Sequence, residues 1–180
     1  MSKKKLSFVV QQHDATHMHW DFRLEMDGVL VSWAIPKGPS LNPANKRLAI
    51  RVVDHEFSYK DFEGVITGDD YGAGKVIIWD SGYYEPAGAD PAADLHRSWL
   101  ADGKLEFTLY GEKLKGQWAL IKTKSKQYGE DSWLLIKKKD EFAAEEDILE
   151  KERKSVVSGK SIEEITEEDG TLSSDSWDEE

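Results

Sequence analysis

The clearest pattern in the chain is a strict alternation of polar and apolar residues over His17–Met26. Histidine, aspartate, arginine and glutamate occupy the odd positions, and methionine, tryptophan, phenylalanine and leucine occupy the even positions. A period of two predicts a strand with one apolar and one polar face. Asp27-Gly28 follows, a strong hairpin signal, and Val29–Ile35 is the expected return strand.

Further segments have the length and composition of strands and are separated by Gly, Asn, Asp and Lys turns. They are Leu48–Val53, Gly74–Trp79, Leu105–Tyr110, Gln117–Lys122 and Ser132–Lys138. Many short strands at this spacing predict a mainly β fold, a compact antiparallel β-barrel with a few short helices.

Two helices are expected. Asp90-Pro91 supplies an N-cap and a first-turn proline for a helix that runs to about Leu100. A second helix is expected from about Asp140 to Lys154. Ser155–Glu180 is polar, acidic and poor in apolar residues, so we predict a disordered C-terminal tail. The expected division is a barrel domain over residues 1–140 and a helix plus acidic tail over residues 141–180.

Composition limits the classes of function. The chain has 180 residues, of which 39% are hydrophobic, enough for a packed core. It has no cysteine, so any transition metal must be held by His, Asp or Glu. No apolar run approaches the roughly 20 residues of a membrane span, and the N-terminus lacks the pattern of a secretory signal. We therefore expect a cytoplasmic protein with no membrane partner.

The net charge of −11 is unevenly distributed. Residues from Glu141 onward include 15 acidic and 4 basic side chains, whereas residues 1–140 include 20 of each. Because the expected barrel is neutral, a phosphate-binding surface on it must be a local cluster of cations.

The polar face of the His17–Met26 segment predicts a metal or anion site. Each histidine alone is more often a surface or core residue, but the cluster on one strand favours a site. Two imidazoles and a carboxylate are a common ligand set for Mn²⁺, Fe²⁺ or Zn²⁺. We expect His13, Asp21 and His55 to be the metal ligands.

Cations lie near these residues in the sequence. Arg23 shares a face with Asp21, Lys37 follows the return strand, and Arg47 and Arg51 lie on the next strand. Arginine is the usual bidentate partner of phosphate and lysine a point-charge partner. A metal beside such cations indicates a phosphoryl clamp, although Arg51 fits a solvated strand charge equally well.

With these motifs the sequence resembles the 3′-phosphoesterase domain of bacterial DNA ligase D, including its free-standing bacterial and archaeal relatives. The matching stretches are FVVQQHDATHMHWDFRLEMDGVLVSWAIPKGPSLNP, KRLAIRVVDHEFSYKDFEG and YGAGKVIIWDSG, which run from Phe8 to Gly82 almost without a gap. The resemblance implies a compact β-barrel and a Mn²⁺-dependent enzyme, and Zn²⁺ and Co²⁺ also suit the ligands. The implied activity removes a 3′-terminal ribonucleoside and then hydrolyses the remaining 3′-phosphate to a 3′-OH.

The resemblance also implies roles for residues. It puts the metal on His13, Asp21 and His55, the set already chosen from their chemistry. Further residues match positions that contact or act on the phosphate: His19, Arg23, Lys37, Arg47 and Tyr59. From the residues alone, Tyr59 is either a phenol donor at the site or a core residue. The expected partners are primer–template DNA with a 3′-ribonucleotide or 3′-phosphate, a separate ligase, a polymerase and Ku, and the expected state is a monomer.

Two other classes of function are compatible with parts of the pattern. His19-x-Asp21 with a distal histidine also resembles the facial triad of non-haem Fe²⁺ oxygenases, although an oxygenase needs no row of phosphate-binding cations. A non-catalytic nucleic-acid-binding module predicts metal-independent binding with a steep salt dependence. A neutral barrel with an acidic tail disfavours this third interpretation.

Overall fold

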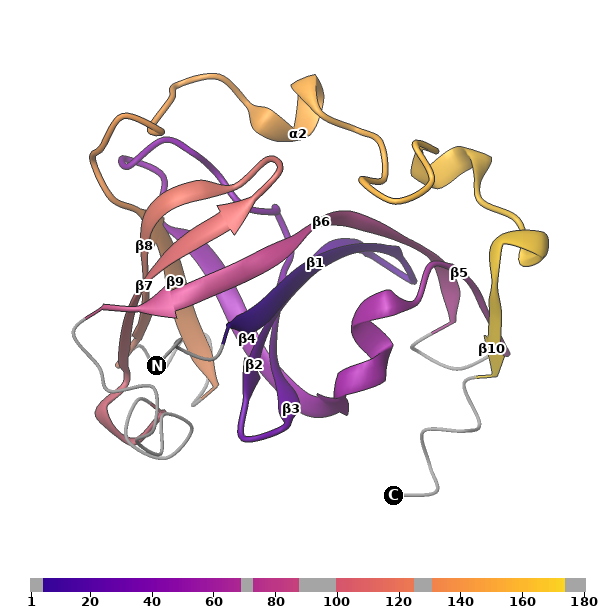
Figure 1. Ribbon diagram of the computed structural model, residues 1–180, viewed down its shortest axis with the longest axis horizontal. Helices are drawn as coiled ribbons and strands as arrows, with labels where there is room; N and C mark the ends of the chain where they lie inside the picture. Colours follow the sequence, from indigo (N-terminus) through magenta and orange to yellow (C-terminus); the bar gives the residue numbers. More distant parts are fainter. Residues whose placement is uncertain (1–4, 69–72, 88–99, 125–130, 174–180) are drawn as a thin grey trace.

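The computed structural model describes residues 5–68, 73–87, 100–124 and 131–173. Strands close into an antiparallel barrel in the order β1-β2-β3-β4-β9-β8-β7-β6, and β6 pairs back onto β1 (Figure 1). The barrel strands are β1 (Leu6–Asp14), β2 (Met18–Met26), β3 (Val29–Ile35), β4 (Arg47–Glu56), β6 (Gly74–Pro86), β7 (Lys104–Gly111), β8 (Lys115–Lys122) and β9 (Ser132–Lys137). This arrangement confirms the predicted mainly β fold and antiparallel barrel.

Two short strands extend the sheet beyond the barrel. β5 (Gly64–Thr67) pairs antiparallel with β6, and β10 (Thr171–Ser173) pairs parallel with β5. A turn of 3₁₀ helix, η1 (Phe57–Asp61), connects β4 to this extension. Figure 1 shows η1 lying between β5 and the β1–β3 part of the barrel.

The alternation of apolar and polar residues determines which side chains of a strand point into the barrel core. On β2, Phe22, Leu24 and Met26 are buried in the core, which receives side chains from all the barrel strands. The largest side chains in it include Trp33, Trp79, Trp118 and Trp133. The polar residues of β2 therefore lie on the face that points away from the core.

The predicted hairpin at Asp27-Gly28 is confirmed. Both residues have positive φ, 52° for Asp27 and 86° for Gly28, as a two-residue type I′ turn requires. The turn sets a register in which Met26 lies opposite Val29. The same register places Arg23 opposite Ser32.

β5 and β10 were not predicted, and two of the barrel strands, β1 and β6, also differ from the expected segments. β1 was not predicted because it lacks alternation at its centre, where Phe8–Val10 are all buried. β6 runs past Trp79 to Pro86 with a register shift against β1. After the shift Asp80 is buried, and its carboxylate accepts hydrogen bonds from three backbone N–H groups of the turn at residues 112–114.

The predicted helix from Asp140 to Lys154 is wrong except for one turn. That turn is α2 (Ile148–Lys151), where the Asp147 side chain caps the Leu149 N–H. Asp140 instead pairs with Lys137 Nζ at 2.7 Å and accepts the Gln117 N–H, so the chain here is tied to the barrel. The helix expected from Asp90 lies outside the described residues, apart from its last residue at Leu100.

Among the described helices, none has the length and apolar character needed to cross a membrane.

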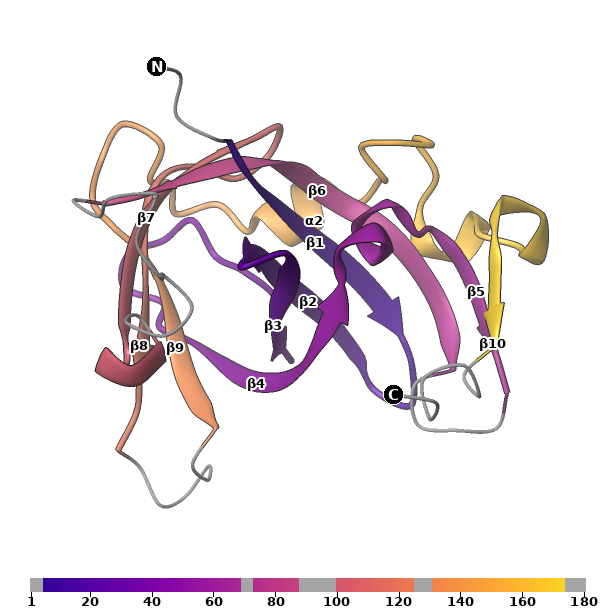
Figure 2. The ribbon, with the colours of Figure 1, turned by 60° about the horizontal axis from the view of Figure 1, so that its bottom comes forward.

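Residues 155–173, assigned from composition to a disordered tail, pack on the barrel. Ile162 and Ile165 are buried in the core cluster, and Val156 N–H donates to the Ile78 carbonyl at 3.0 Å. The segment contains two 3₁₀ turns, η2 (Ile162–Glu164) and η3 (Glu167–Asp169). Figures 1 and 2 show it running along β6 to reach β5 and ending in β10. Residues 174–180 lie outside the described residues, and the expected division near residue 140 stays a prediction.

Burial of these isoleucines gives a stability test. We expect Ile165→Ala to lower the free energy of unfolding by roughly 2–5 kcal/mol, the usual loss for a large-to-small core substitution. Urea denaturation followed by tryptophan fluorescence measures it. The matched control is Val157→Ala in the same segment, because Val157 is 67% exposed; its change should stay within about 0.5 kcal/mol. Equal, negligible changes in both variants would contradict the packing described here.

Candidate metal centre

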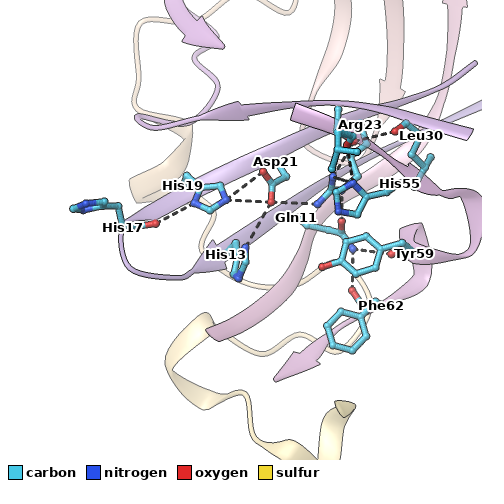
Figure 3. A network of polar contacts seen from close by, with 12 residues as sticks. Gln11, His13, His17, His19, Asp21, Arg23, Leu30, His55, Tyr59 and Phe62 are labelled. Atoms are coloured by element: carbon cyan, nitrogen blue, oxygen red, sulfur yellow. Dashed lines mark hydrogen bonds and ion pairs between the residues drawn. The ribbon is translucent and has the colours of Figure 1, made fainter. Parts of the chain in front are cut away.

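The register of β1 and β2 brings predicted site residues together. His13 lies opposite His19, and Gln11 lies opposite Asp21. Odd positions of both strands share the face away from the core, so these side chains meet on one surface. The ligand atoms of His13, His19 and Asp21 all lie within 4.8 Å of one another. Figure 3 shows the two imidazoles side by side, with contacts from both to the carboxylate.

The Asp21 carboxylate is the centre of this group. His19 Nε2 lies 3.2 Å from it, and His13 Nδ1 lies 3.8 Å from Oδ2. The other nitrogen of His19, Nδ1, lies 3.0 Å from the His17 carbonyl oxygen. When neutral His19 carries its proton on Nδ1, that proton donates to the carbonyl, and Nε2 is then available to coordinate a metal. Such a backbone contact is typical of a metal-binding histidine, because it fixes the tautomer.

His55 does not belong to this group. It lies on β4, two strands from Asp21, and its Nδ1 is 3.2 Å from Arg23 Nη1 and 3.0 Å from the Val53 carbonyl. Its ring stacks on Tyr59 with centroids 5.0 Å apart. The structure groups two of the three expected ligands, His13 and Asp21, with His19, and His55 as the third ligand stays a prediction.

Arg23 connects the carboxylate to the rest of the site. Its side chain is 2% exposed. Nη2 donates to Asp21 Oδ2 at 3.2 Å and Nη1 donates to Ser32 Oγ at 2.8 Å. Nε donates to Gln11 Oε1 at 2.7 Å, and the guanidinium carbon lies 4.9 Å from the centre of the Tyr59 ring. These contacts fix one positive charge directly beside the metal-ligand candidates.

Comparison with known proteins identifies the family. A family model for the DNA ligase D 3′-phosphoesterase domain matches residues 11–122. The chain belongs to this family. It is 48% identical over 161 residues to the multifunctional non-homologous end joining protein LigD of Pseudomonas aeruginosa, and 43% identical over 134 residues to the protein of that name from Mycolicibacterium smegmatis. The alignments cover 87% and 74% of this chain but only 18% and 17% of those relatives. The chain thus spans under a fifth of their length.

Gln11 is a residue of this 3′-phosphoesterase domain that the sequence analysis missed. Its amide is fully buried, and Nε2 donates to the carbonyls of Tyr59 and Phe62 at 2.9 and 3.1 Å. Gln11 therefore fastens η1 to β1 while its oxygen receives Arg23. Strand parity was the available signal, since Gln11 lies two residues before His13 on one face of β1.

Phe62 completes a stack of three rings in the domain. The Tyr59 ring lies between the rings of His55 and Phe62, with centroid distances of 5.0 and 5.6 Å. From the sequence, Tyr59 was either a phenol donor at the site or a core residue. The structure places it in a buried position in contact with Arg23, within the polar network of Figure 3.

Charges in the site follow from burial and from Arg23. Burial raises the pKa of Asp21, but the Arg23 guanidinium and the neighbouring imidazoles outweigh it and hold the pKa far below its usual range. Burial opposes the charged form of His19, but the Asp21 carboxylate outweighs it and raises the pKa of His19. Burial and Arg23 lower the pKa of His55 to about 4, and burial raises the pKa of Tyr59 to about 12. At neutral pH the site thus offers a carboxylate, an uncharged His55 and an intact phenol.

The donor set fits a divalent transition metal. One ionised carboxylate and two imidazoles are the ligands that Mn²⁺, Zn²⁺ and Co²⁺ share. In addition, His13 Nε2 is buried and has no hydrogen-bond partner among the described residues. A buried nitrogen without a partner destabilises the fold, and a ligand bound to that nitrogen would remove the cost.

The structure does not connect the remaining predicted cations to the ligand group. Lys37 is exposed in the turn after β3, and Arg47 begins β4. Within the described residues, neither makes a polar contact with Asp21. Arg47 Nε is buried and has no hydrogen-bond partner among the described residues. Arg51 forms an ion pair with Asp54 at 3.5 Å. Phosphate contacts by Lys37 and Arg47 stay predictions.

Metal binding distinguishes the observed group from the expected set. We expect His19→Ala to weaken Mn²⁺ binding by at least about tenfold, because a ligand is lost. His55→Ala should leave the affinity within about twofold, because Arg23 separates it from the group. Titration followed by the electron paramagnetic resonance of free Mn²⁺ measures both. The reverse ranking of these two variants would favour His13, Asp21 and His55 instead.

Proposed function

We propose that this chain is a metal-dependent phosphoesterase that heals the 3′ ends of nucleic-acid strands. Its two reactions are removal of a 3′-terminal ribonucleoside and hydrolysis of a 3′-phosphate to a 3′-OH, with Mn²⁺ as the metal. The observation that carries this proposal is the grouping of His13, His19 and Asp21 beside a buried Arg23, in a chain of the DNA ligase D 3′-phosphoesterase family.

The names of the relatives support a role in non-homologous end joining. We extend that role to this chain as part of the proposal, with the healed end passed to a ligase and a polymerase that act with Ku. A monomer in the cytoplasm remains our expectation for its state and location.

The protein side chains divide the chemical work. A divalent ion on the three ligands supplies a Lewis acid for a phosphoryl oxygen. Arg23 stabilises negative charge that develops on the phosphate, from a position that its hydrogen bonds already fix. Tyr59 retains its proton at neutral pH and can donate a hydrogen bond to a phosphoryl oxygen. Burial and Arg23 lower the pKa of His55 to about 4, so His55 stays uncharged and can accept a hydrogen bond from the attacking water.

In the hydrolysis step, the oxygen of water bonds to phosphorus while the bond from phosphorus to O3′ breaks. The water releases one proton to solvent, and O3′ takes up one proton from solvent as it leaves as the alcohol. In the ribonuclease step the 2′-OH is the group that separates a ribonucleotide from a deoxyribonucleotide. These assignments give His55 and Tyr59 roles at the phosphate, and His19 a role at the metal.

The ligand group also suits a second class of enzyme. Two histidines and one carboxylate form the facial triad of non-haem Fe²⁺ oxygenases. Membership of the phosphoesterase family favours hydrolysis, as does the guanidinium of Arg23 beside the triad. Turnover in the absence of O₂ and of any oxo-acid separates the two classes.

The direct test is a radiolabelled primer with one 3′-ribonucleotide on a DNA template, incubated anaerobically with and without Mn²⁺. We expect shortening to a 3′-phosphate and then conversion to a 3′-OH only with metal. Asp21→Ala should slow both steps by at least about 100-fold, since both the metal and the Arg23 pair are lost. Tyr59→Phe should cost only about tenfold, the loss of one hydrogen bond.

His55→Ala is the informative control, because it should remain able to bind Mn²⁺ and yet lose activity. Phosphatase activity retained in Asp21→Ala would refute the proposed site. Binding of the primer with no turnover under any metal would instead indicate a non-catalytic module, with an affinity that falls steeply with salt.

A further inference from the structure

We propose that Tyr83, Tyr110 and Lys5 form a second nucleic-acid contact, which binds the strand that leads away from the candidate metal centre. This inference rests on the proposed function, because it takes the 3′ end of that strand to lie at the metal centre. It adds a stacking platform on a part of the barrel remote from the chemistry.

The two tyrosines form an ordered pair on the outside of the barrel. They lie directly opposite each other on β6 and β7, and their rings stack with centroids 4.9 Å apart and planes inclined by 22°. Their neighbours Tyr84 and Leu109 face the core. Tyr110 remains 41% exposed, so a large part of its ring is available to a ligand.

A cation adjoins the pair. Lys5 Nζ lies 4.7 Å from the centre of the Tyr83 ring. Stacked aromatic rings beside a lysine are the elements that bind a single strand without reading its sequence: bases stack on the rings, and the cation attracts the backbone. Glu85 interacts with Tyr110, so the phosphates are expected on the Lys5 side of the pair.

Stacking between cross-strand tyrosines also stabilises a sheet. A comparison with the exposed ring of Phe142 shows that sheet stability does not explain every feature of the pair. Phe142 has the same exposed fraction, 41%, but makes no ring or cation contact with another described residue. An exposed ring by itself is therefore ordinary on this protein. Two stacked rings with a cation also occur at Tyr59 and Phe62 beside Arg23, but Tyr59 is buried there. In the Tyr83–Tyr110 pair, by contrast, Tyr110 is exposed.

The pair adjoins the same face of β1 as the metal centre, and the residues of that face between them, Val9 and Gln11, are buried. Tyr83 is paired with Ser7 of β1, and Ser7 is on the same face of that strand as Gln11 and His13. From Ser7 to His13 is six residues, or about 20 Å at about 3.3 Å per residue. Stacked nucleotides rise about 3.4 Å each, so a strand with its end at His13 reaches the pair after about six nucleotides.

The predicted dependence on length supplies the experiment. Fluorescence anisotropy compares labelled single-stranded DNA of about four and about twelve nucleotides, both ending in a 3′-OH. We expect Tyr110→Ala to weaken binding of the longer strand by about tenfold, within the range for loss of one base–aromatic stack, and to leave the shorter strand unchanged. Tyr110→Phe keeps the ring and should bind like the wild type.

Phe142→Ala is the matched control and should change neither affinity. Equal weakening for both lengths, or the same loss in Phe142→Ala, would overturn the proposal. So would sedimentation data in which Tyr110→Ala converts a dimer to a monomer, because the pair would then be a contact between copies of this chain. Failure of the proposed function is separate: it would appear as no hydrolysis of a 3′-phosphate by the wild type, while the anisotropy still decides the stacking contact.

Discussion

The ion pair between Arg23 and Asp21 is the interaction on which the candidate site depends. Both side chains are removed from water, and a buried charge is tolerated only when it is paired and hydrogen-bonded. The guanidinium meets this requirement with Asp21, Gln11 and Ser32, which come from three adjacent strands. The same contacts that neutralise Arg23 therefore position the carboxylate between the two imidazoles. Stability and site geometry cannot be separated here, since loss of either partner leaves an uncompensated charge.

Local sequence predicted the parts of this arrangement that depend on one strand. The alternation over His17–Met26 and the Asp27-Gly28 turn determine which side chains of β2 face the core. His19, Asp21 and Arg23 therefore share a polar face, as expected. The choice of ligands depended on pairing between strands, which a single sequence does not reveal. His13 meets His19 because β1 and β2 are in register, whereas His55 lies two strands away in contact with Arg23, and its role as a ligand stays a prediction.

The remaining differences have similar causes. β1 has a run of buried residues at its centre because both of its faces are covered there, the inner face by the core and the outer face at Gln11 by the η1 region, so no period of two marks it. In the C-terminal segment the average composition is polar and acidic, yet Ile162 and Ile165 find apolar partners on the barrel. Composition over a window cannot register single anchor residues that become buried only through tertiary contacts. The helix expected from Asp140 does not begin there, because the Asp140 carboxylate accepts the Gln117 N–H and pairs with Lys137, which ties the chain to the barrel.

The short strand β10 has a consequence for association between molecules. Without it, β5 would present an unpaired edge, and such an edge invites another chain to add a strand. β10 covers β5 with three residues in parallel register, two of them Thr171 and Ser173. Parallel pairing is slightly weaker per residue than antiparallel pairing, and so brief a strand offers little template for further growth. The end of the C-terminal segment thus protects the sheet from edge-to-edge aggregation.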